Sequence, residues 1–118
     1  MFEMIFFATD AGRQPVKEFL DALDVKMRNK VLDNLKHLQI HGHHLREPYS
    51  KPLGDGIFEL RTRLGSDITR VLYFFFVGKR IVLTHGFVKK TQKTPPQEIE
   101  RAKEYRAMYH KREENNHG

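Results

Sequence analysis

The second half of the chain has the hydrophobic spacing of consecutive β-strands. In residues 57–64, charged and mainly apolar positions alternate, which is typical of a strand whose two faces differ. Residues 68–77 are almost wholly apolar and indicate a strand covered on both faces, and residues 80–88 form a third strand-like segment. The breaks at residues 65–67 and 78–79 are short, so we expect the three strands to be antiparallel neighbours.

The first half of the chain combines one apolar segment with helix-like spacing. Residues 1–8 are apolar and aromatic and predict a strand. Pro15 suits the first turn of a helix, where its missing N–H costs no hydrogen bond. Asp24 suits the N-cap of a second helix that ends near Gly42. The apolar positions of this second helix recur every three or four residues: Met27, Val31, Leu35 and Leu38. We expect the two helices to form a hairpin across one face of the sheet.

The remaining segments are a loop and a last helix. Residues 47–56 contain two prolines and two glycines and predict a loop. Pro95 and Pro96 open the last helix, which we expect to lie near the edge of the sheet and to fray from Lys111 onward. The predicted fold class is α+β: a small, twisted, mainly antiparallel sheet with an N-terminal helix hairpin and a C-terminal helix. Residues 1–112 would form a single domain and residues 113–118 a frayed tail.

Composition narrows the classes of protein to which the chain can belong. The 118 residues leave room for one domain, and the absence of cysteine excludes disulfides, thiolate metal sites and cysteine nucleophiles. No apolar run approaches the roughly 20 residues of a membrane helix, and residues 1–8 do not resemble a secretory signal, so we expect a cytoplasmic protein. His41, His43 and His44 have no acidic residue or cysteine spaced to complete a metal site, so we expect neither a metal nor a cofactor.

Positive charge is concentrated in one part of the chain. The net charge is +6 and the pI about 9.7, which favours a polyanionic partner such as nucleic acid, an acidic membrane surface or an acidic protein. Residues 79–112 hold ten Lys and Arg against three Glu, a net charge of +7. Cations also occur within the predicted strands. A sheet that buries positive charge loses stability unless an anion or a carboxylate neutralises that charge. These cations are the main functional signal of the sequence.

Four short motifs follow one another through the second half of the chain. They are GIFELR at residues 56–61, TRVLYFF at 69–75, IVLTHGFVKK at 81–90 and TQKTP at 91–95. Together with the preceding strand and helix pair, they resemble the phage-derived, HigB-like branch of the RelE toxin superfamily over nearly the whole chain. The resemblance implies a RelE/ParE-like fold and the toxin of a type II toxin–antitoxin pair, a ribosome-dependent mRNA endoribonuclease that inhibits translation. Its partners would be ribosome-bound mRNA and a cognate HigA-like helix-turn-helix antitoxin, with no membrane and no metal.

The resemblance also implies which residues cut RNA. In that superfamily they are mostly cations on the concave sheet face and after the last strand. The matching positions here are Arg61, Arg70, Lys89 and Lys90, with Lys51 from the loop before the sheet. Cleavage of RNA by its own 2′-hydroxyl needs a base, cations for the phosphate oxygens that gain charge, and an acid for the leaving 5′-oxygen. Arginine suits the second task because its planar fork matches a phosphate and stays protonated. A lysine can be the base where neighbouring cations lower its pKa.

Three further residues have two interpretations each. Glu59 can be the base or the partner that neutralises Arg61 or Arg63. His85 has an ordinary pKa suited to an acid, but its place in an apolar strand also fits a packed structural histidine. Tyr73 can stack in the site or belong to the core. The predicted catalytic set is therefore Arg61, Arg70, Lys89, Lys90, Glu59 and His85. The predicted RNA-binding set is Lys51, Arg63, Tyr73 and Lys93.

Alternatives stay open for the arginines and for the function. Arg61 and Arg70 could be structural, in ion pairs with Glu59 and Asp67. Strict alternation does not decide whether the two arginines share a face, although twist or a bulge near residues 66–67 could bring them together. The same superfamily includes non-catalytic ParE-like toxins that inhibit gyrase, and a basic protein-interaction module is a further alternative.

Overall fold

Five strands form one mixed sheet in the order β1-β5-β4-β3-β2. The computed structural model describes residues 1–88 and 92–117. The strands are β1 (Glu3–Phe6), β2 (Ser50–Gly54), β3 (Ile57–Leu64), β4 (Asp67–Phe76) and β5 (Arg80–Val88). The helices are α1 (Pro15–Ala22), α2 (Val25–His41), the short 3-10 helix η1 (Gly42–His44) and α3 (Pro96–His117). The predicted α+β class is confirmed, as is the meander of the three central strands.

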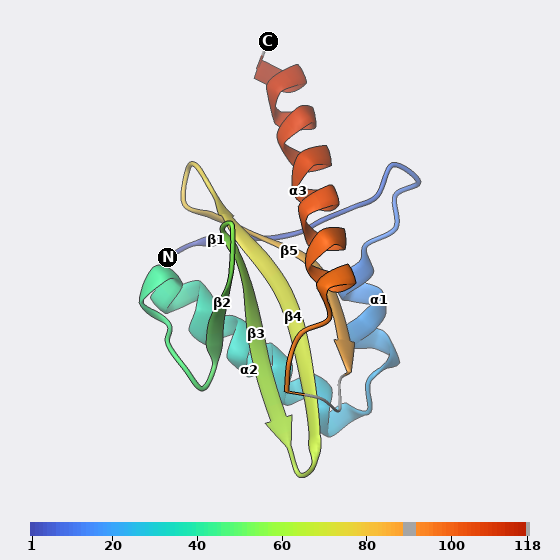
Figure 1. Cartoon of the computed structure of the whole chain (residues 1–118), viewed down its shortest axis with the longest axis vertical. Helices are drawn as coiled ribbons and strands as arrows, with labels where there is room; N and C mark the ends of the chain where they lie inside the picture. The colour runs from blue at the N-terminus through green and yellow to red at the C-terminus, as the bar shows by residue number, and fades with distance from the viewer. Residues whose placement is uncertain (89–91, 118) are drawn as a thin grey trace.

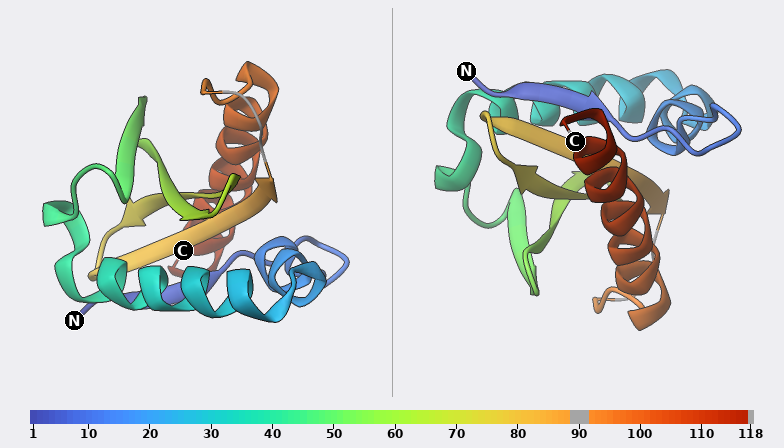
Figure 2. Two further views of the ribbon diagram at one scale, coloured as in Figure 1. Left: turned by 90° about the horizontal axis from the view of Figure 1, so that it is seen from below. Right: turned by 90° about the horizontal axis from the view of Figure 1, so that it is seen from above.

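The sheet is the middle of three layers. Helices α1 and α2 lie across one face and α3 lies across the other (Figures 1 and 2). Strands β2 to β5 pair antiparallel in sequence order. The short β1 joins the sheet at the far edge, parallel to β5. The sheet is therefore mainly antiparallel, as predicted, with one parallel edge strand.

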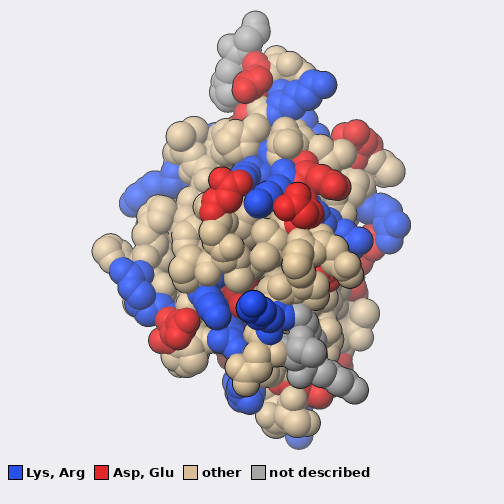
Figure 3. Space-filling model, in the orientation of Figure 1, with Lys and Arg blue, Asp and Glu red and all other residues tan. Residues whose placement is uncertain are grey.

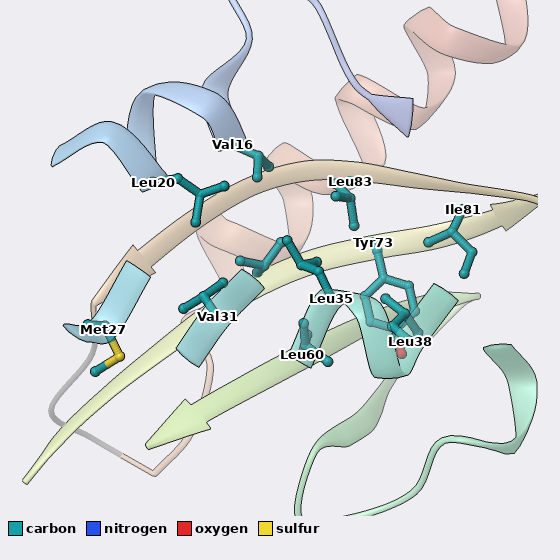
Figure 4. Close-up of a cluster of buried hydrophobic side chains, with 11 residues drawn as sticks. Val16, Leu20, Met27, Val31, Leu35, Leu38, Leu60, Tyr73, Ile81 and Leu83 are labelled. Carbon is teal, nitrogen blue, oxygen red and sulfur yellow. The ribbon is translucent and has the colours of Figure 1, made fainter. Parts of the chain in front are cut away.

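The main core fills the space between the helix pair and the sheet (Figure 4). The four predicted apolar positions of α2 are all buried there. The helix begins at its predicted N-cap, since the Asp24 carboxylate accepts hydrogen bonds from the backbone N–H groups of Lys26 and Met27 at 3.0 and 3.4 Å. It ends at Gly42, whose φ of 52° is a conformation that glycine adopts without strain. The predicted helix hairpin is confirmed.

The predicted loop at residues 47–56 contains a strand that the sequence did not indicate. Strand β2 pairs with β3 and forms the outer edge of the sheet. An edge strand tolerates Pro52 because one side of its backbone needs no partner in the ladder. Asp55 and Gly56, with φ of 53° and 76°, make the tight turn that joins the two strands. The loop prediction is therefore wrong for residues 50–54.

Helix α3 covers a face of the sheet, whereas the sequence placed it near an edge. Ala102 is fully buried against β3, β4 and β5, and Tyr105 stacks on Phe7 with 4.6 Å between ring centroids. The helix also continues to His117, past the fraying expected from Lys111 onward. Contacts with other elements hold this last part: Glu113 pairs with Arg80, and Arg112 Nη2 lies 2.8 Å from Asp10 Oδ1. Among the described residues, no helix has the length and apolarity that crossing a membrane requires.

A bulge in β5 changes which side its residues face. The register shifts at Leu72 and Tyr73, so that Thr84 is an extra residue between Leu83, opposite Tyr73, and His85, opposite Leu72. Leu83 faces the helix pair, and His85 faces α3. Strict alternation along residues 80–88 predicts Leu83 and His85 on one side of the sheet, and this is wrong because one inserted residue reverses a period of two.

Candidate functional site

Arg61 and Arg70 lie on the same face of the sheet. They are directly opposite each other in the pairing of β3 with β4, and opposed residues of an antiparallel pair share a face. Glu59 and Leu72 form the corresponding pair two residues away, and Leu72 packs in the core cluster beneath α3. Both arginines and Glu59 are therefore on the α3 face. The β3–β4 pairing is regular throughout, so no bulge near residues 66–67 is involved.

Arg70 is buried and bound to the Glu59 carboxylate. Its Nε lies 3.3 Å from Glu59 Oε2, and the two side chains are 0% and 2% exposed. Burial lowers the pKa of Arg70 from its ordinary value, Glu59 opposes that shift, and Arg61 adds to it. An arginine starts from so high a pKa that it keeps its proton. The predicted ion pair of Arg70 with Glu59 is thus present, and Arg70 faces a carboxylate instead of solvent.

The segment before α3 closes over this ion pair. The Thr94 hydroxyl donates to Glu59 Oε2 at 2.9 Å. Arg70 donates from Nη1 to Thr94 Oγ1 at 3.3 Å and from Nη2 to the Gln92 carbonyl at 3.0 Å. Removing one partner of a buried pair leaves an uncompensated charge, so the group acts as one unit. The contacts of Gln92 and Thr94 were not predicted. Every residue has a backbone carbonyl, so residue type does not show that the carbonyl of Gln92 binds Arg70.

An open cleft of about 580 Å³ lies beside the Glu59–Arg70 pair, between β2, β3 and residues 92–96. Its lining includes Lys51, Glu59, Lys93 and Thr94. Lys51 is directly opposite Glu59 in the pairing of β2 with β3, so an exposed ammonium group and a buried carboxylate belong to neighbouring positions. Lys and Arg side chains gather over β2 and β3 on this side of the molecule (Figure 3).

The cations near the cleft differ in how they are neutralised. Within residues 1–88 and 92–117, no carboxylate pairs with Lys51, Arg61 or Arg63. The strongly basic segment from residue 79 onward is different, because many of its cations have carboxylate partners. The pairs are Lys103 and Arg106 with Asp55, Arg112 with Asp10, and Arg80 with Glu113. Among the described residues, these cations of β2 and β3 therefore lack carboxylate partners, whereas most cations of α3 have them.

A family match now places the chain. Residues 18–107 match the model of the family described as phage derived protein Gp49-like (DUF891). The chain belongs to the Gp49-like family. This family is linked to toxins of the RelE/HigB type, and the matched residues include β2 to β5 and all the described cleft residues. A comparison with curated proteins gave no match.

Two predicted residues of this Gp49-like protein lie outside the described residues. They are Lys89 and Lys90, directly after β5. Two others are close to Arg61 and the cleft: Lys93 lines the cleft, and Arg63 lines a second pocket at the edge of β3, together with Arg61. Of the predicted residues in the described part of the chain, Lys51, Glu59, Arg61, Arg70 and Lys93 are brought to one region.

Tyr73 is not part of this region. Its side chain is 1% exposed and belongs to the core beneath α1 and α2, on the face of the sheet opposite Arg61. Its hydroxyl shares a hydrogen bond of 2.6 Å with Ser50 Oγ, which satisfies a buried polar atom. The predicted RNA-binding place of Tyr73 is therefore wrong, and its interpretation as a core residue is confirmed.

His85 lies on the α3 face but beneath the helix. It is 4% exposed, and its Nδ1 is 3.1 Å from the hydroxyl of Thr84. Burial, and then the charge of Arg101, lower the pKa of His85 to about 4. The ring is thus neutral at neutral pH, so its 3.5 Å contact with Glu98 is not an ion pair there. This placement favours the structural interpretation of His85 over the role of acid.

The described residues offer little for binding a metal ion. In residues 1–88 and 92–117, no three His, Asp or Glu side chains come together as a group that could hold one. The histidines after α2 are used differently, since the ring of His43 stacks on Phe75 with 3.7 Å between centroids. The cleft offers ammonium, carboxylate and hydroxyl groups, and the arginines beside it add guanidinium groups.

Proposed function

We propose that this Gp49-like protein is the toxin of a type II toxin–antitoxin pair, of the HigB-like branch, and that it cleaves ribosome-bound mRNA at the cleft beside Glu59. The observation that carries the proposal is the grouping of Lys51, Arg61 and the Glu59–Arg70 pair on one side of the sheet. An RNA strand is a polyanion, and cations without carboxylate partners favour its binding. A neighbouring carboxylate adds a group that can accept a proton.

The proposed reaction uses the 2′-hydroxyl of the RNA as the nucleophile and requires no metal ion. Glu59 takes the proton of the 2′-hydroxyl, the 2′-oxygen bonds to phosphorus, and the bond to the 5′-oxygen breaks. Lys51 and Arg61 stabilise the phosphate oxygens that gain charge. The products are a 2′,3′-cyclic phosphate and a 5′-hydroxyl. Lys89 and Lys90 are candidates for giving the 5′-oxygen its proton.

The buried position of Glu59 gives the reaction a requirement. Its carboxylate accepts a hydrogen bond from Thr94 and faces Arg70, so RNA must displace Thr94 to reach it. Arg70 is then a positioning residue, because it orients Glu59 without touching the substrate. This role differs from the direct phosphate contact that the resemblance implied for Arg70.

Induced expression tests the proposal. We expect the wild type to stop growth and to create new mRNA 5′ ends within translated codons. Lys51→Ala and Arg61→Ala should each reduce both effects, and the double variant should abolish them. Lys111→Ala removes the same charge from an exposed site on α3 and should behave as wild type. If the double variant still stopped growth and created the same 5′ ends as the wild type, the cleft would not be the site of cleavage.

One observation favours a second function, that of a non-catalytic ParE-like toxin. Arg70 and Glu59 are buried against each other, as in a purely structural ion pair. In that case the variants Lys51→Ala and Arg61→Ala would leave growth arrest intact, no new 5′ ends would arise, and the purified protein would inhibit DNA supercoiling by gyrase. Two measurements therefore distinguish the two functions: sequencing of mRNA 5′ ends and a gel assay of DNA supercoiling by gyrase.

The proposed toxin needs a partner that neutralises it. We propose a HigA-like helix-turn-helix antitoxin encoded next to this gene. Co-expression of the adjacent reading frame should restore growth, and the two proteins should purify as a complex. An adjacent frame that binds the protein without restoring growth would speak against the toxin–antitoxin arrangement.

A further inference from the structure

A second pocket lies at the outer edge of β3, beyond the point where β2 ends. Strand β2 pairs with β3 only as far as Leu60. From there the space beside β3 is bordered by α2 and by residues 48–49, and it forms a pocket of about 290 Å³. Lys30, Tyr49, Arg61 and Arg63 are among the residues that line it. The early end of β2 thus leaves a hollow beside three cations.

These three cations have no carboxylate to offset them. Within the described residues, Lys30, Arg61 and Arg63 form no ion pair, and no acidic residue lines the pocket. The ammonium group of Lys30 donates a hydrogen bond to the backbone carbonyl of Arg63, which fixes it at the pocket. Like charges that line one pocket repel one another unless an anion lies between them. The pocket therefore favours a negatively charged ligand.

The pocket also presents an aromatic ring outside the core. Tyr49 is 46% exposed. Its backbone is held in place, because its carbonyl accepts the N–H of Arg61 at 2.7 Å and its N–H donates to the Arg46 carbonyl at 3.0 Å. Its ring stacks with His37 at 6.2 Å between centroids. A fixed, exposed ring beside cations is the combination with which proteins bind unpaired nucleotides, by stacking and by phosphate contacts.

We propose that this pocket binds one nucleotide of single-stranded RNA, with its phosphate between Arg61, Arg63 and Lys30 and its base on Tyr49. The proposal rests on RNA being the substrate of the neighbouring cleft. Arg61 lines the pocket and is directly opposite Arg70 in the sheet, so it connects the pocket to the cleft. The bound nucleotide lies next to the one that is cut and sets the register of the strand.

Binding of an RNA that cannot be cleaved tests the pocket separately from the reaction. The probe is a fluorescent 2′-O-methyl hexanucleotide, measured by anisotropy at several salt concentrations. We expect Tyr49→Ala to weaken binding about 10-fold, since one stacked base is lost, and Tyr49→Phe to bind within about twofold of wild type. Arg63→Ala should reduce the slope of log affinity against log salt by about 0.7, the value for one phosphate of a single strand. Lys111→Ala, the matched charge control, should bind nearly as wild type does.

The outcomes separate the pocket from the proposed function. Tyr49→Ala binding as tightly as wild type, or Lys111→Ala weakening binding as much as Arg63→Ala, would overturn the pocket, whatever the protein does to ribosome-bound mRNA. Binding that depends on Tyr49 in a protein that cuts no mRNA would retain the pocket and reject the nuclease. A nucleoside monophosphate that binds as tightly as the hexanucleotide would also overturn the proposal, because the pocket would then serve a free nucleotide.

Discussion

His85 is kept neutral beneath α3, and this has a consequence for stability. The pKa of His85 is lowered from 6.5 to about 4, first by burial and then by Arg101, while Glu98 faces the ring at 3.5 Å. Between these two pH values the unfolded chain binds a proton that the folded protein does not. The contribution of His85 is therefore fully present above pH 6.5 and is lost as the pH falls toward 4.

The size of this effect can be measured by urea unfolding of wild type and His85→Gln. At about 1.4 kcal/mol per pKa unit, we expect the wild type to lose about 2 to 3 kcal/mol more than the variant between pH 7 and pH 4.5. Other titrating groups are common to both proteins and cancel in the difference. Equal losses would mean that His85 takes up its proton without cost in the folded protein.

The Glu59–Arg70 pair is expected to behave as one unit. Arg70→Ala leaves a buried carboxylate without its partner and should lower the free energy of unfolding by about 3 to 5 kcal/mol, as should Glu59→Ala. The double variant Glu59→Ala with Arg70→Ala removes both charges and should be far less destabilised than the sum of the two single changes. Denaturant unfolding of the three variants checks this, and additive losses would contradict a coupled pair.

At the scale of single residues, the sequence indicated which cations belong to the sheet but not what surrounds them. Lys51, Arg61 and Lys93 lie in or beside the cleft as residue type and order suggested. The burial of Arg70 could not be predicted, because it depends on residues 92–94 folding back over the sheet. Tyr73 was misplaced because an apolar strand with both faces covered does not reveal which side a given ring faces.

At the scale of elements, the spacing of apolar residues predicted the helices and the long strands. It did not predict the short edge strand β2 or the bulge in β5. Asp24 and Gly42 marked the ends of α2 because capping requires particular side chains and backbone angles. Strand β2 was hidden by Pro52 and the neighbouring Pro48, and the extra Thr84 in β5 has no signature in the sequence. Pro95 and Pro96 marked the start of α3, but an opening proline does not say which surface the helix covers.

The packing of α1 against β5 gives a prediction at this scale. Gly86 leaves room for the ring of Phe19, since a Cβ added at Gly86 would lie 2.4 Å from Phe19 Cδ2. Gly86→Ala should therefore destabilise the protein by about 1 to 3 kcal/mol through overpacking. Adding Phe19→Leu should restore part of the loss, and thermal unfolding of both single variants and the double variant measures it. If the stability lost in the double variant equalled the sum of the losses in the two single variants, this packing would be contradicted.

At the scale of the whole molecule, the main core and the cleft lie on opposite faces of the sheet. The helix pair and the sheet enclose the main core, while α3 covers only part of the opposite face. The rest of that face is left to the cleft, and α3 is anchored by ion pairs to Asp55 and Asp10. The net charge of +6 therefore says less about where a polyanion would bind than the positions of the cations that lack carboxylate partners.

This distribution predicts how RNA binding depends on salt. If Lys30, Lys51, Arg61 and Arg63 each contact one phosphate, the slope of log affinity against log salt should be about −3 for a single strand. Removing α3 cations such as Arg112, which is paired with Asp10, should leave the slope unchanged. A slope that falls equally for both groups of residues would indicate binding by overall charge.

The central claim is that cations grouped around Glu59 break RNA through its own 2′-hydroxyl. The most direct test is the chemistry of the ends that purified protein leaves on mRNA in a stalled ribosome. We expect a 2′,3′-cyclic phosphate and a 5′-hydroxyl, no cut where the 2′-oxygen at the cleavage position is methylated, and a rate at least about 100-fold lower for Glu59→Gln. Ends carrying a 3′-hydroxyl, a cut beside a methylated 2′-oxygen, or no cut at all would contradict the account.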